Sequence, residues 1–406
     1  MARMANRAGM YVRQPSGYTA FIPKPLPPEP EAAMDRQFAM LLSSADQALG
    51  RLDGTTDILP NPDLFVFMYV RKEAVLSSQI EGTQASLIDV LQFEANAVDR
   101  SKPQDVEEVV NYVAAMNHGL KRLSTLPVSL RLIREIHKRL MQGVRGEEKT
   151  PGEFRRSQNW IGSPGSTLET ARFIPPPPQE MKDSLYDLER FLHDDKPMPL
   201  LQKVGLAHGQ FETIHPFLDG NGRIGRLLIT LLLCERGVLR RPLLYLSFFF
   251  RKHQKEYYDR LQAVRDDGDW EGWLEFFVRG VQQTAEEATK TARRIGGMRE
   301  EHRRLILERL GSGAGNGLTL LESLYRRPIF SVQQAAEIAR LAFPNANALV
   351  ARMEELGLLR EMTGRRRNRL FAYHPYLELF SEGPIRTNQE SAATSSPKLH
   401  GGRART

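Results

Sequence analysis

The chain has 406 residues, of which 41% are hydrophobic and 26% are charged. These are ordinary values for a globular protein, and they exclude a wholly disordered or collagen-like chain. A single cysteine, Cys234, excludes an internal disulfide framework and a cysteine-rich zinc site. No apolar run long enough for a membrane span and no secretory signal is present, so we expect a soluble cytoplasmic protein with two or three domains.

The charge is distributed unevenly. The 56 basic and 49 acidic residues give a formal net charge of +7. Residues 301–406 carry sixteen basic and ten acidic side chains, a net +6, so the first 300 residues are nearly neutral. The excess charge therefore concerns the C-terminal quarter, and nucleic acid is a candidate partner only there.

The predicted elements begin after a proline-rich segment, residues 1–34, whose prolines disfavour a helix and favour an extended strip. Apolar residues at helical spacing predict a helix from Met34 to Gly54. Pro62 is placed to open a second helix, which breaks near Glu81. Further helices are predicted at 86–98, 104–125, 128–143, 180–195, 198–214, 224–237, 248–265 and 268–295. The fold class is therefore mainly α.

One segment, residues 155–178, departs from this pattern, and little β-propensity precedes it. Gly162 and Gly165 lie in a turn between two short β-prone stretches, which predicts a small hairpin. The four prolines at 175–178 exclude a helix there.

The C-terminal quarter has the outline of a separate small domain. Residues 311–317, GSGAGNG, are expected to form a flexible linker. Three helices are predicted, at 318–326, 331–341 and 346–356. Ser331 is placed as an N-cap, and two β-prone runs follow around Gly364. Three short helices and a hairpin are typical of a winged helix-turn-helix domain, and the polar residues after Gly383 are expected to be disordered.

The most informative stretch is His215–Arg226, which reads HPFLDGNGRIGR. Its glycines permit a close backbone approach to an anion, and the apolar run that follows predicts a helix whose N-terminus favours a phosphate. Its two arginines suit phosphate oxygens, Asp219 suits Mg²⁺, and His215 suits a general base. Glycines alone would fit an ordinary helix entry with a solvated cap. The full set of groups indicates a phosphate site that is not a Walker loop.

The same residues carry a family resemblance. The stretch His215–Arg226 matches the H-P-F-x-[DE]-G-N-G-R-x-x-R signature of the Fic family, and GEFRRSQNWIG, YLSFFFRKHQKEYYDRL and GDWEGWLEFF also resemble Fic proteins. The resemblance covers about residues 16–300. It implies an all-helical Fic core with a small β-hairpin flap. The expected domains are an N-terminal region with an inhibitory helix (1–110), the catalytic core (111–300), a winged helix-turn-helix (301–382) and a disordered tail (383–406).

The resemblance implies a nucleotidyltransferase that moves AMP from ATP to a Ser, Thr or Tyr hydroxyl of a protein and releases pyrophosphate. His215 would be the catalytic base, and Asp219 would hold Mg²⁺. Departures that mark relatives with other donors, such as a lysine in the loop, are absent. The residues expected at ATP are Glu81, His215, Gly220, Asn221, Gly222, Arg223, Ile224, Gly225, Arg226 and Tyr258.

A second stretch, Ser77-Ser-Gln-Ile-Glu81-Gly82, resembles the Fic inhibitory motif [ST]-x-x-x-E-[GN]. In the family this glutamate pairs with the second arginine of the signature, here Arg226, and blocks the place of the γ-phosphate. The alternative is an ordinary helix C-terminus, where glycine is common. We expect an auto-inhibited enzyme that also modifies itself when the brake is removed.

Aromatic residues complete the expected site. Tyr258 is expected to contact adenine, with packing against the core as the alternative. The flap residues Trp160, Ile161 and Gly162 are expected to dock the target protein as an added strand, with Trp160 as a packing anchor being the alternative.

The basic C-terminal domain admits two interpretations. Arg365–Arg367 and Arg369 fall on the predicted wing, and Arg352 falls on the third helix, as DNA contacts would require. A protein-interaction or homodimer-packing module with a solvated wing is the alternative. The competing function for the chain is a winged-helix DNA-binding regulator whose Fic part senses nucleotide.

Overall fold

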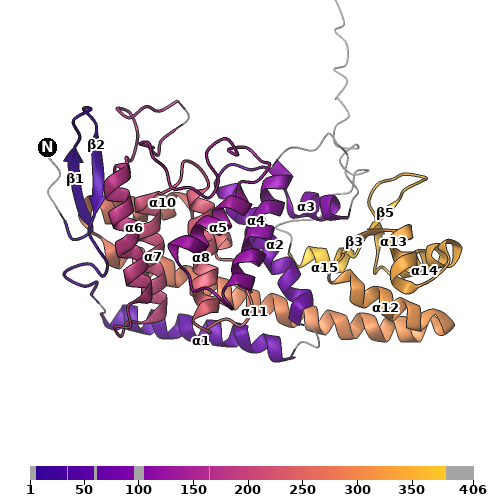
Figure 1. Ribbon diagram of the computed structural model, residues 1–406. Helices are drawn as coiled ribbons and strands as arrows, with labels where there is room; N and C mark the ends of the chain where they lie inside the picture. The colour runs from indigo at the N-terminus through magenta and orange to yellow at the C-terminus, as the bar shows by residue number, and fades with distance from the viewer. Residues whose placement is uncertain (1–5, 34, 59–61, 96–104, 164, 381–406) are drawn as a thin grey trace, which may run out of the picture. The chain divides into compact units, whose positions relative to one another are not determined.

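The computed structural model describes residues 6–33, 35–58, 62–95, 105–163 and 165–380 (Figure 1). The chain forms two compact units. The first, here called the catalytic unit, comprises Met1–Val90 and Ser101–Lys290, and the second, the C-terminal unit, comprises Leu91–Arg100 and Thr291–Thr406. Across the described ranges, none of the helices is both long and apolar enough to cross a membrane.

The catalytic unit opens with a hairpin that the sequence did not predict. Strand β1 (Gly9–Arg13) pairs antiparallel with β2 (Thr19–Pro23), and the ring of Tyr11 packs edge-on against that of Phe21 at 5.0 Å. The prediction of an extended strip was wrong for residues 9–23, which form this hairpin, while described residues 24–33 form no helix, as the prolines predicted. Pro15 lies in the turn between the strands and Pro23 ends the second strand, both positions that a hairpin tolerates, so the prolines did not exclude it.

Helices make up the rest of the unit, as the periodicity predicted. They are α1 (Arg36–Ile58), α2 (Pro62–Ile80), α3 (Leu87–Glu94), α4 (Asp105–Arg122), α5 (Leu130–Leu140), α6 (Pro178–His193), α7 (Leu200–Ile214), α8 (Asn221–Glu235), α9 (Ser247–Lys252), α10 (Gln254–Asp267) and α11 (Trp270–Arg309). Two of them, α3 and α11, continue past the residues where the units divide. The predicted helix at 248–265 is two helices that meet at His253.

Local chemistry explains several helix ends. Pro178, the last of the four prolines, is the first residue of α6. Proline is tolerated at the first position of a helix, because its missing N–H would have no partner there. Ser129 caps α5 by accepting a hydrogen bond from the Leu132 amide. Gly268 ends α10 in the left-handed conformation with φ 72°.

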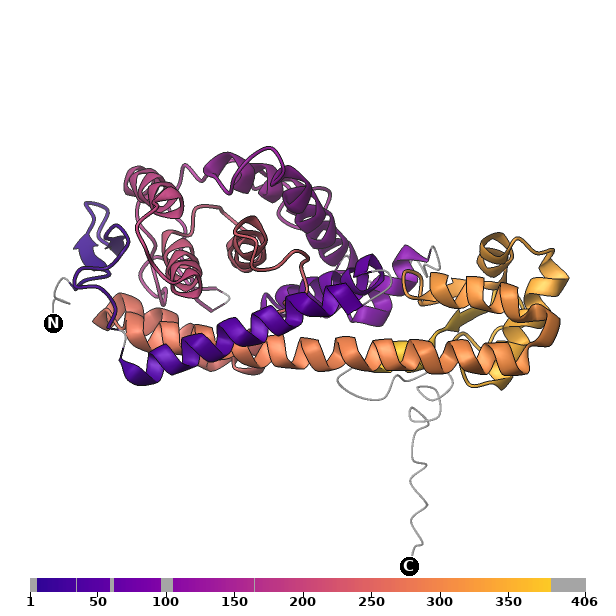
Figure 2. The same cartoon turned by 90° about the horizontal axis from the view of Figure 1, so that it is seen from below.

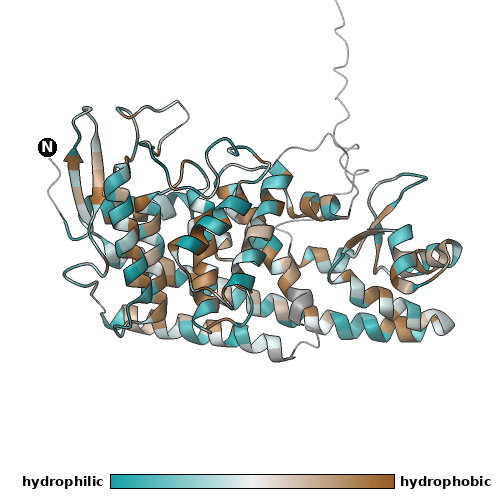
Figure 3. Cartoon of the chain, viewed as in Figure 1, coloured by the Kyte–Doolittle hydropathy of each residue, from teal (hydrophilic) through white to brown (hydrophobic). Residues whose placement is uncertain are grey.

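Helix α8 is the centre of the catalytic unit. It packs against α2, α4, α5 and α7, and Figure 2 shows it within a ring of other helices, with α1 running alongside the first part of α11. Ile224, Leu227 and Leu231 are fully buried in it. Figure 3 shows hydrophilic residues along the loops at the upper edge of this unit. A helix that is apolar on almost every side must be surrounded, and its N-terminus therefore carries the signature loop into the middle of the unit.

The predicted flap hairpin is reduced to one bridge. Ile161 and Phe173 exchange two backbone hydrogen bonds of 2.8 and 3.0 Å, and the residues between them form turns. The hairpin expected in this segment is therefore a loop closed at its base. Gly165 adopts φ 85°, and the turns of the described residues around it leave too few extended residues for a ladder.

The C-terminal unit has the predicted helices and terminal hairpin, plus an unpredicted first strand. Its elements are α12 (Ala314–Leu324), β3 (Ile329–Ser331), α13 (Val332–Ala339), α14 (Phe343–Glu355), β4 (Arg360–Glu361), β5 (Leu370–Ala372) and α15 (His374–Glu378). The sheet order is β3-β5-β4, all antiparallel. Ser331 caps α13 as expected, in a capping box with Gln334.

The expected flexible linker at 311–317 is wrong. Gly311–Gly313 form a 3-10 turn directly after α11, and α12 begins at Ala314. Gly317 lies against Leu310 and Ile306, where a β-carbon would come within 2.5 Å, so this glycine permits close packing between helices. The domain boundaries at 110 and 300 stay predictions, and the expected disordered tail, 383–406, lies outside the described residues.

Candidate functional site

The signature loop links α7 to α8 and is held rigidly by its own residues. His215 ends α7 in the left-handed conformation with φ 50°, and Gly220 precedes α8 with φ 76°. The side chain of Asn221 accepts a hydrogen bond from the Phe217 amide and donates one to the Phe217 carbonyl, both at 2.8 Å. Asn221 therefore fixes the loop with its side chain, and only its backbone is left for an anion.

A buried arginine from outside the signature fixes His215. Arg155 donates to the His215 carbonyl at 3.0 Å and to the Pro176 carbonyl at 2.5 Å. Asn159 donates to the carbonyls of His215 and Phe217 at 3.2 and 2.9 Å. Burial lowers the pKa of Arg155 to about 10. These roles of Arg155 and Asn159 were not predicted from the sequence, where the FRRSQN run was the available signal.

The imidazole of His215 is neutral. Its Nδ1 is buried and makes no hydrogen bond to the described residues. Burial, reinforced by Arg155 and Arg265, lowers the pKa of His215 to about 3. The carbonyl of Glu212 and the carboxylate of Asp219 oppose this effect more weakly. A neutral ring keeps a lone pair to accept a proton at neutral pH.

A second histidine, absent from the sequence-based site, supports Asp219. His137 donates from Nε2 to the Asp219 carbonyl at 3.0 Å, since its Nδ1 accepts the Gly152 amide at 2.8 Å. Its ring stacks on Phe217 with centroids 3.7 Å apart. Burial lowers the pKa of His137 to about 4. Nothing in the spacing of the sequence links residue 137 to residue 219.

The first turn of α8 contains the remaining small residues of the signature. Ile224 and Gly225 are buried, and a β-carbon on Gly225 would lie 2.4 Å from Glu212 Oε1. Gly222 is exposed to the site, and a β-carbon there would lie 2.2 Å from Glu81 Oε1. The Glu81 carboxylate therefore rests against the N-terminal turn of α8, where free amide groups and the helix dipole favour an anion.

Glu81 also binds Arg226. The guanidinium of Arg226 donates to Glu81 Oε1 at 2.6 Å, and to the hydroxyl and carbonyl of Ser77 at 2.9 Å each. The Arg226 side chain is 2% exposed and that of Glu81 is 34% exposed. Burial works against the charged form, but the Glu81 carboxylate raises the pKa of Arg226 above its ordinary value. Gly82, just after the end of α2, has φ 97°, a backbone conformation that favours glycine.

Arg223 has a partner that the sequence did not reveal. Its Nη1 lies 3.0 Å from Glu108 Oε2 on α4, and its Nη2 lies 3.6 Å from Asp219 Oδ1. Both Arg223 and Glu108 have side chains that are 3% exposed. The two signature arginines, expected to bind phosphates together, are therefore paired with different carboxylates.

Two parts of the chain match known protein families. Residues 39–121 match the Fic/DOC family N-terminal model, and residues 127–233 match the Fic/DOC family model. The chain therefore contains a Fic/DOC N-terminal region and a Fic/DOC domain. The first match contains Glu81 and Glu108, and the second contains the whole signature loop.

Curated relatives of this Fic chain are known in insects. A protein adenylyltransferase Fic from Aedes aegypti is 29% identical over 273 residues, which cover 64% of this chain and 51% of that protein. A protein adenylyltransferase Fic from Drosophila erecta is 28% identical over 191 residues, which cover 46% of this chain and 35% of that protein. The chain thus spans about half the length of these relatives or less.

A solved structure shares the fold. The crystal structure of a Fic family protein from Desulfovibrio desulfuricans G20 has a TM-score of 0.55 and 17% sequence identity. The match covers 84% of this chain and 97% of that one. This likeness confirms the mainly α, Fic-type fold.

The Fic signature contains one carboxylate that is open to a metal. Asp219 is 30% exposed, and its Oδ2 accepts a hydrogen bond from Lys149 Nζ at 3.0 Å. Burial would raise the pKa of Asp219, but Lys149 and Arg223 lower it below its ordinary value. No group of three or more His, Cys, Asp and Glu side chains in the described part of the chain could hold a metal alone. A single carboxylate beside an anion site fits Mg²⁺ that is shared with phosphates.

Tyrosines from α10 border the Fic site. Tyr257 is fully buried and its hydroxyl lies 2.9 Å from His208 Nε2, which makes it a core residue. Tyr258 is partly exposed, and burial together with Glu81 raises its pKa to about 12. Both tyrosines interact electrostatically with Arg226 and Glu81, and Tyr258 is the one that is partly exposed.

The flap presents an apolar side chain to solvent. The Trp160 side chain is exposed, and its indole donates to the Ser166 carbonyl at 2.8 Å. Ile161 makes the bridge to Phe173, and a β-carbon on Gly162 would lie 2.6 Å from the Ser166 hydroxyl. Trp160 is therefore fixed on the outside of the flap and is not a core anchor.

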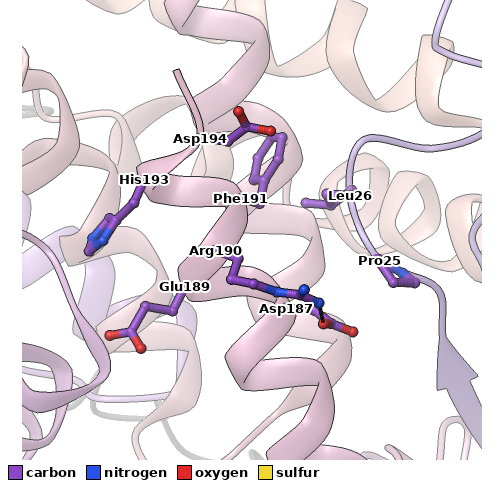
Figure 4. Close-up of a pocket in the computed structure, with 8 residues that line it drawn as sticks. All are labelled: Pro25, Leu26, Asp187, Glu189, Arg190, Phe191, His193 and Asp194. Atoms are coloured by element: carbon purple, nitrogen blue, oxygen red, sulfur yellow. Dashed lines mark hydrogen bonds and ion pairs between the residues drawn. The ribbon is translucent and has the colours of Figure 1, made fainter. Parts of the chain in front are cut away.

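A hollow of about 670 Å³ lies elsewhere, on the outer face of α6. Figure 4 shows Arg190 directed toward Asp187, and Glu189 and His193 on the other side of the helix from Pro25 and Leu26. Glu189 accepts the Leu130 amide at 2.8 Å, and His193 lies 2.8 Å from the Val128 carbonyl. Glu189 and His193 are thus used in hydrogen bonds that hold α6 to residues 128–130, and we do not assign the hollow to the site.

Proposed function

We propose that this Fic chain is an auto-inhibited protein adenylyltransferase. It transfers AMP from ATP to a Ser, Thr or Tyr hydroxyl of a target protein and releases pyrophosphate. The observation that carries the proposal is a neutral, rigidly held His215 beside an α8 N-terminus that is built to receive an anion. The activity in the names of the insect relatives points the same way.

In this proposal His215 removes the proton of the target hydroxyl. The hydroxyl oxygen forms a bond to the α-phosphorus, and the bond from that phosphorus to the bridging β-oxygen breaks with its electrons leaving on pyrophosphate. The backbone of Gly220–Gly222 and the dipole of α8 stabilise the negative charge on the phosphates. A base held in place contributes about 10²–10⁴-fold to the rate.

Asp219 is the residue that would hold Mg²⁺ in this site. A bound Mg²⁺ would neutralise charge on the phosphates of ATP. The fit rests on a partly exposed carboxylate with a lowered pKa, adjacent to the phosphate-binding turn. His137 and Arg223 orient that carboxylate through its backbone and its Oδ1.

Glu81 is the proposed brake. Its carboxylate lies against Gly222 and engages Arg226, so it competes with the γ-phosphate for both the helix N-terminus and the guanidinium. Gln254 also donates to the Ile80 carbonyl at 3.1 Å, which ties the end of α2 to α10 and helps to hold Glu81 in place. Tyr258 then borders the adenine, and the exposed Trp160, with Ile161 and Gly162, docks the target.

The decisive experiment uses the Glu81→Gly variant with Mg²⁺ and ATP that is labelled at either the α- or the γ-phosphate. We expect only the α-label on protein, including the enzyme itself. Glu81→Gly combined with His215→Ala should lose at least about a hundredfold of this labelling while ATP still binds. Transfer of the γ-label, or unchanged labelling without His215, would contradict the proposal.

A second function, binding of duplex DNA, rests on a separate observation in the C-terminal unit. A groove of about 810 Å³ lies there between the wing loop (residues 363–369), the start of α13 and the start of α14. Arg365, Arg366 and Arg367 line it, and the described residues offer their guanidinium groups no hydrogen bond or ion pair. Such cations suit a phosphate backbone.

The third helix contributes less to this function than the sequence suggested. Arg352 donates to the carbonyls of Arg309 and Leu310 at 2.7 and 3.3 Å, so its guanidinium is used within the unit. The Glu354 side chain likewise accepts the Glu361 amide at 3.0 Å. The wing arginines, rather than α14, are therefore the proposed DNA contacts.

The DNA proposal predicts salt-dependent binding of a short duplex. Neutralising Arg365, Arg366 and Arg367 to Gln should reduce the slope of log K against log salt by about three. The matched control is the pair Arg326→Gln and Arg327→Gln, which are exposed in the same unit but outside the groove. An unchanged slope in the wing variant would leave adenylyl transfer as the function of the chain. A homodimer through this unit stays a prediction.

A further inference from the structure

The loop that follows α5 sends two cations toward the signature. Residues 143–152 read GVRGEEKTPG and form a series of turns. Arg145 lies 3.5 Å from Glu108 Oε1, and Lys149 lies 3.0 Å from Asp219 Oδ2. The same short loop therefore reaches two carboxylates on different elements.

These two contacts belong to one row of side chains with alternating charges. Arg223 lies in the middle of this row, 3.0 Å from Glu108 Oε2 and 3.6 Å from Asp219 Oδ1. The order is Arg145, Glu108, Arg223, Asp219, Lys149, with three cations for two carboxylates. The centre of this row is buried, whereas the side chains of Arg145 and Lys149 are 64% and 41% exposed. Arg145 and Lys149 can therefore be displaced from their carboxylates more easily than the buried Arg223.

The backbone of the loop places Lys149 over Asp219. Gly146 has φ 90°, and a β-carbon there would lie 3.0 Å from Asp219 Oδ2. The Lys149 amide donates to the Gly146 carbonyl at 2.9 Å, which closes a turn and directs residue 149 back toward that oxygen. The backbone thus approaches Asp219 closely, and the ammonium lies on the oxygen that a metal would need.

We propose that Lys149 is an internal counter-ion that holds the Asp219 carboxylate until a divalent cation displaces it, and so sets the metal affinity of the site. The inference rests on the proposed function for the identity of Asp219 as the metal ligand. An ammonium and a divalent cation compete for one carboxylate oxygen, because like charges repel at short distance. A partly exposed ion pair is weak, and lysine is a flexible donor, so displacement is easy.

The test measures metal binding and not transfer. The intact chain is titrated with Mn²⁺ at a fixed, saturating concentration of ADP, and free Mn²⁺ is followed by electron paramagnetic resonance. The variants are Lys149→Gln, which removes the charge, and Lys149→Arg, which keeps it. Lys182→Gln, an exposed lysine on α6, is the matched control. Asp219→Asn defines the loss of the site, and circular dichroism checks that each variant is folded.

We expect Lys149→Gln to lower the Kd for Mn²⁺ by about two- to fivefold, which corresponds to a weak ion pair. Lys149→Arg and Lys182→Gln should bind as the wild type does. An equal or higher Kd in Lys149→Gln, with Asp219→Asn still defective, would overturn the counter-ion alone. Wild-type Mn²⁺ binding by Asp219→Asn would overturn the metal site in the proposed function, and the counter-ion with it.

Discussion

Two regions of this chain are rich in arginine, and their arginines differ in burial and in ion pairing. In the signature loop, Arg223 and Arg226 are almost fully buried and each meets a carboxylate. In the wing loop, Arg365–Arg367 are exposed and no partner is found for them in the described part of the chain. Buried cations must be paired, whereas exposed cations are stabilised by water. The first arrangement suits one small anion of defined shape, and the second suits an extended polyanion.

The two regions also differ in how ligand binding to their arginines could be regulated. A buried arginine can be switched by exchanging one carboxylate for one phosphate, as Glu81 allows at Arg226. An exposed arginine has no such competitor and responds mainly to salt.

The largest effect is expected on stability when a buried arginine loses its charge. Arg223→Met should lower the free energy of unfolding by about 3–5 kcal/mol, since Glu108 would stay buried with only the exposed Arg145 nearby. Arg366→Met in the wing loop is the matched control and should change it by less than about 0.5 kcal/mol. Urea unfolding measures both. Equal effects of the two substitutions would remove the contrast between the regions.

A buried carboxyl group near Arg226 gives a pH-dependent effect. Burial raises the pKa of Glu212 from 4.5 to about 7. Below pH 4.5 the group is protonated in both states, but as pH rises toward 7 the unfolded chain loses its proton first, so the folded state loses relative stability. Glu212→Gln should remove this loss, which amounts to at most about 3 kcal/mol.

The measurement is the difference in unfolding free energy between wild type and Glu212→Gln at several pH values. The difference should move in favour of the variant between pH 4.5 and 7. Glu275→Gln, exposed on α11, is the control and should show no such trend. A flat difference for Glu212→Gln would mean that the nearby Arg226 and Arg265 stabilise the Glu212 carboxylate as well as water does.

Removing the competitor of phosphate should raise activity. Glu81→Gly is expected to increase AMP transfer, including self-modification, by about 10- to 100-fold, the value of a charge-assisted hydrogen bond. Glu81→Gln keeps the size of the side chain without its charge and should give a smaller increase. The rate of α-label incorporation measures both. Equal or lower activity in Glu81→Gly would exclude inhibition by this residue.

The smallest effects are expected in the wing loop. Replacing Arg365, Arg366 and Arg367 by Gln should leave the melting temperature and the AMP transfer rate of the chain nearly unchanged, within about 0.5 kcal/mol per substitution. Differential scanning calorimetry and the labelling assay check this. A large loss of stability would show that these exposed cations have a structural role after all.

Much of the molecule could be predicted from its sequence because the signals are local. Helical periodicity predicted the helices of the catalytic unit, and Ser331 was correctly predicted to cap a helix, whereas Pro178 was expected to exclude a helix and instead begins one. Signals failed where folding brings distant residues together. The β1–β2 pairing is local, but β2 packs against the distant α6 and α7; the close packing of Gly317 and the single bridge between Ile161 and Phe173 likewise depend on contacts that residue patterns do not specify.

For the site, the sequence by itself determined which chemical groups are present: a histidine, a carboxylate, two arginines and small residues at a helix N-terminus. Only the tertiary structure decided their partners and charge states. Burial keeps His215 neutral, Glu81 occupies Arg226, Glu108 holds Arg223, and Lys149 covers Asp219. The physical reason is that pKa values and ion pairs depend on distance and solvent exposure in three dimensions, which spacing along a chain does not specify.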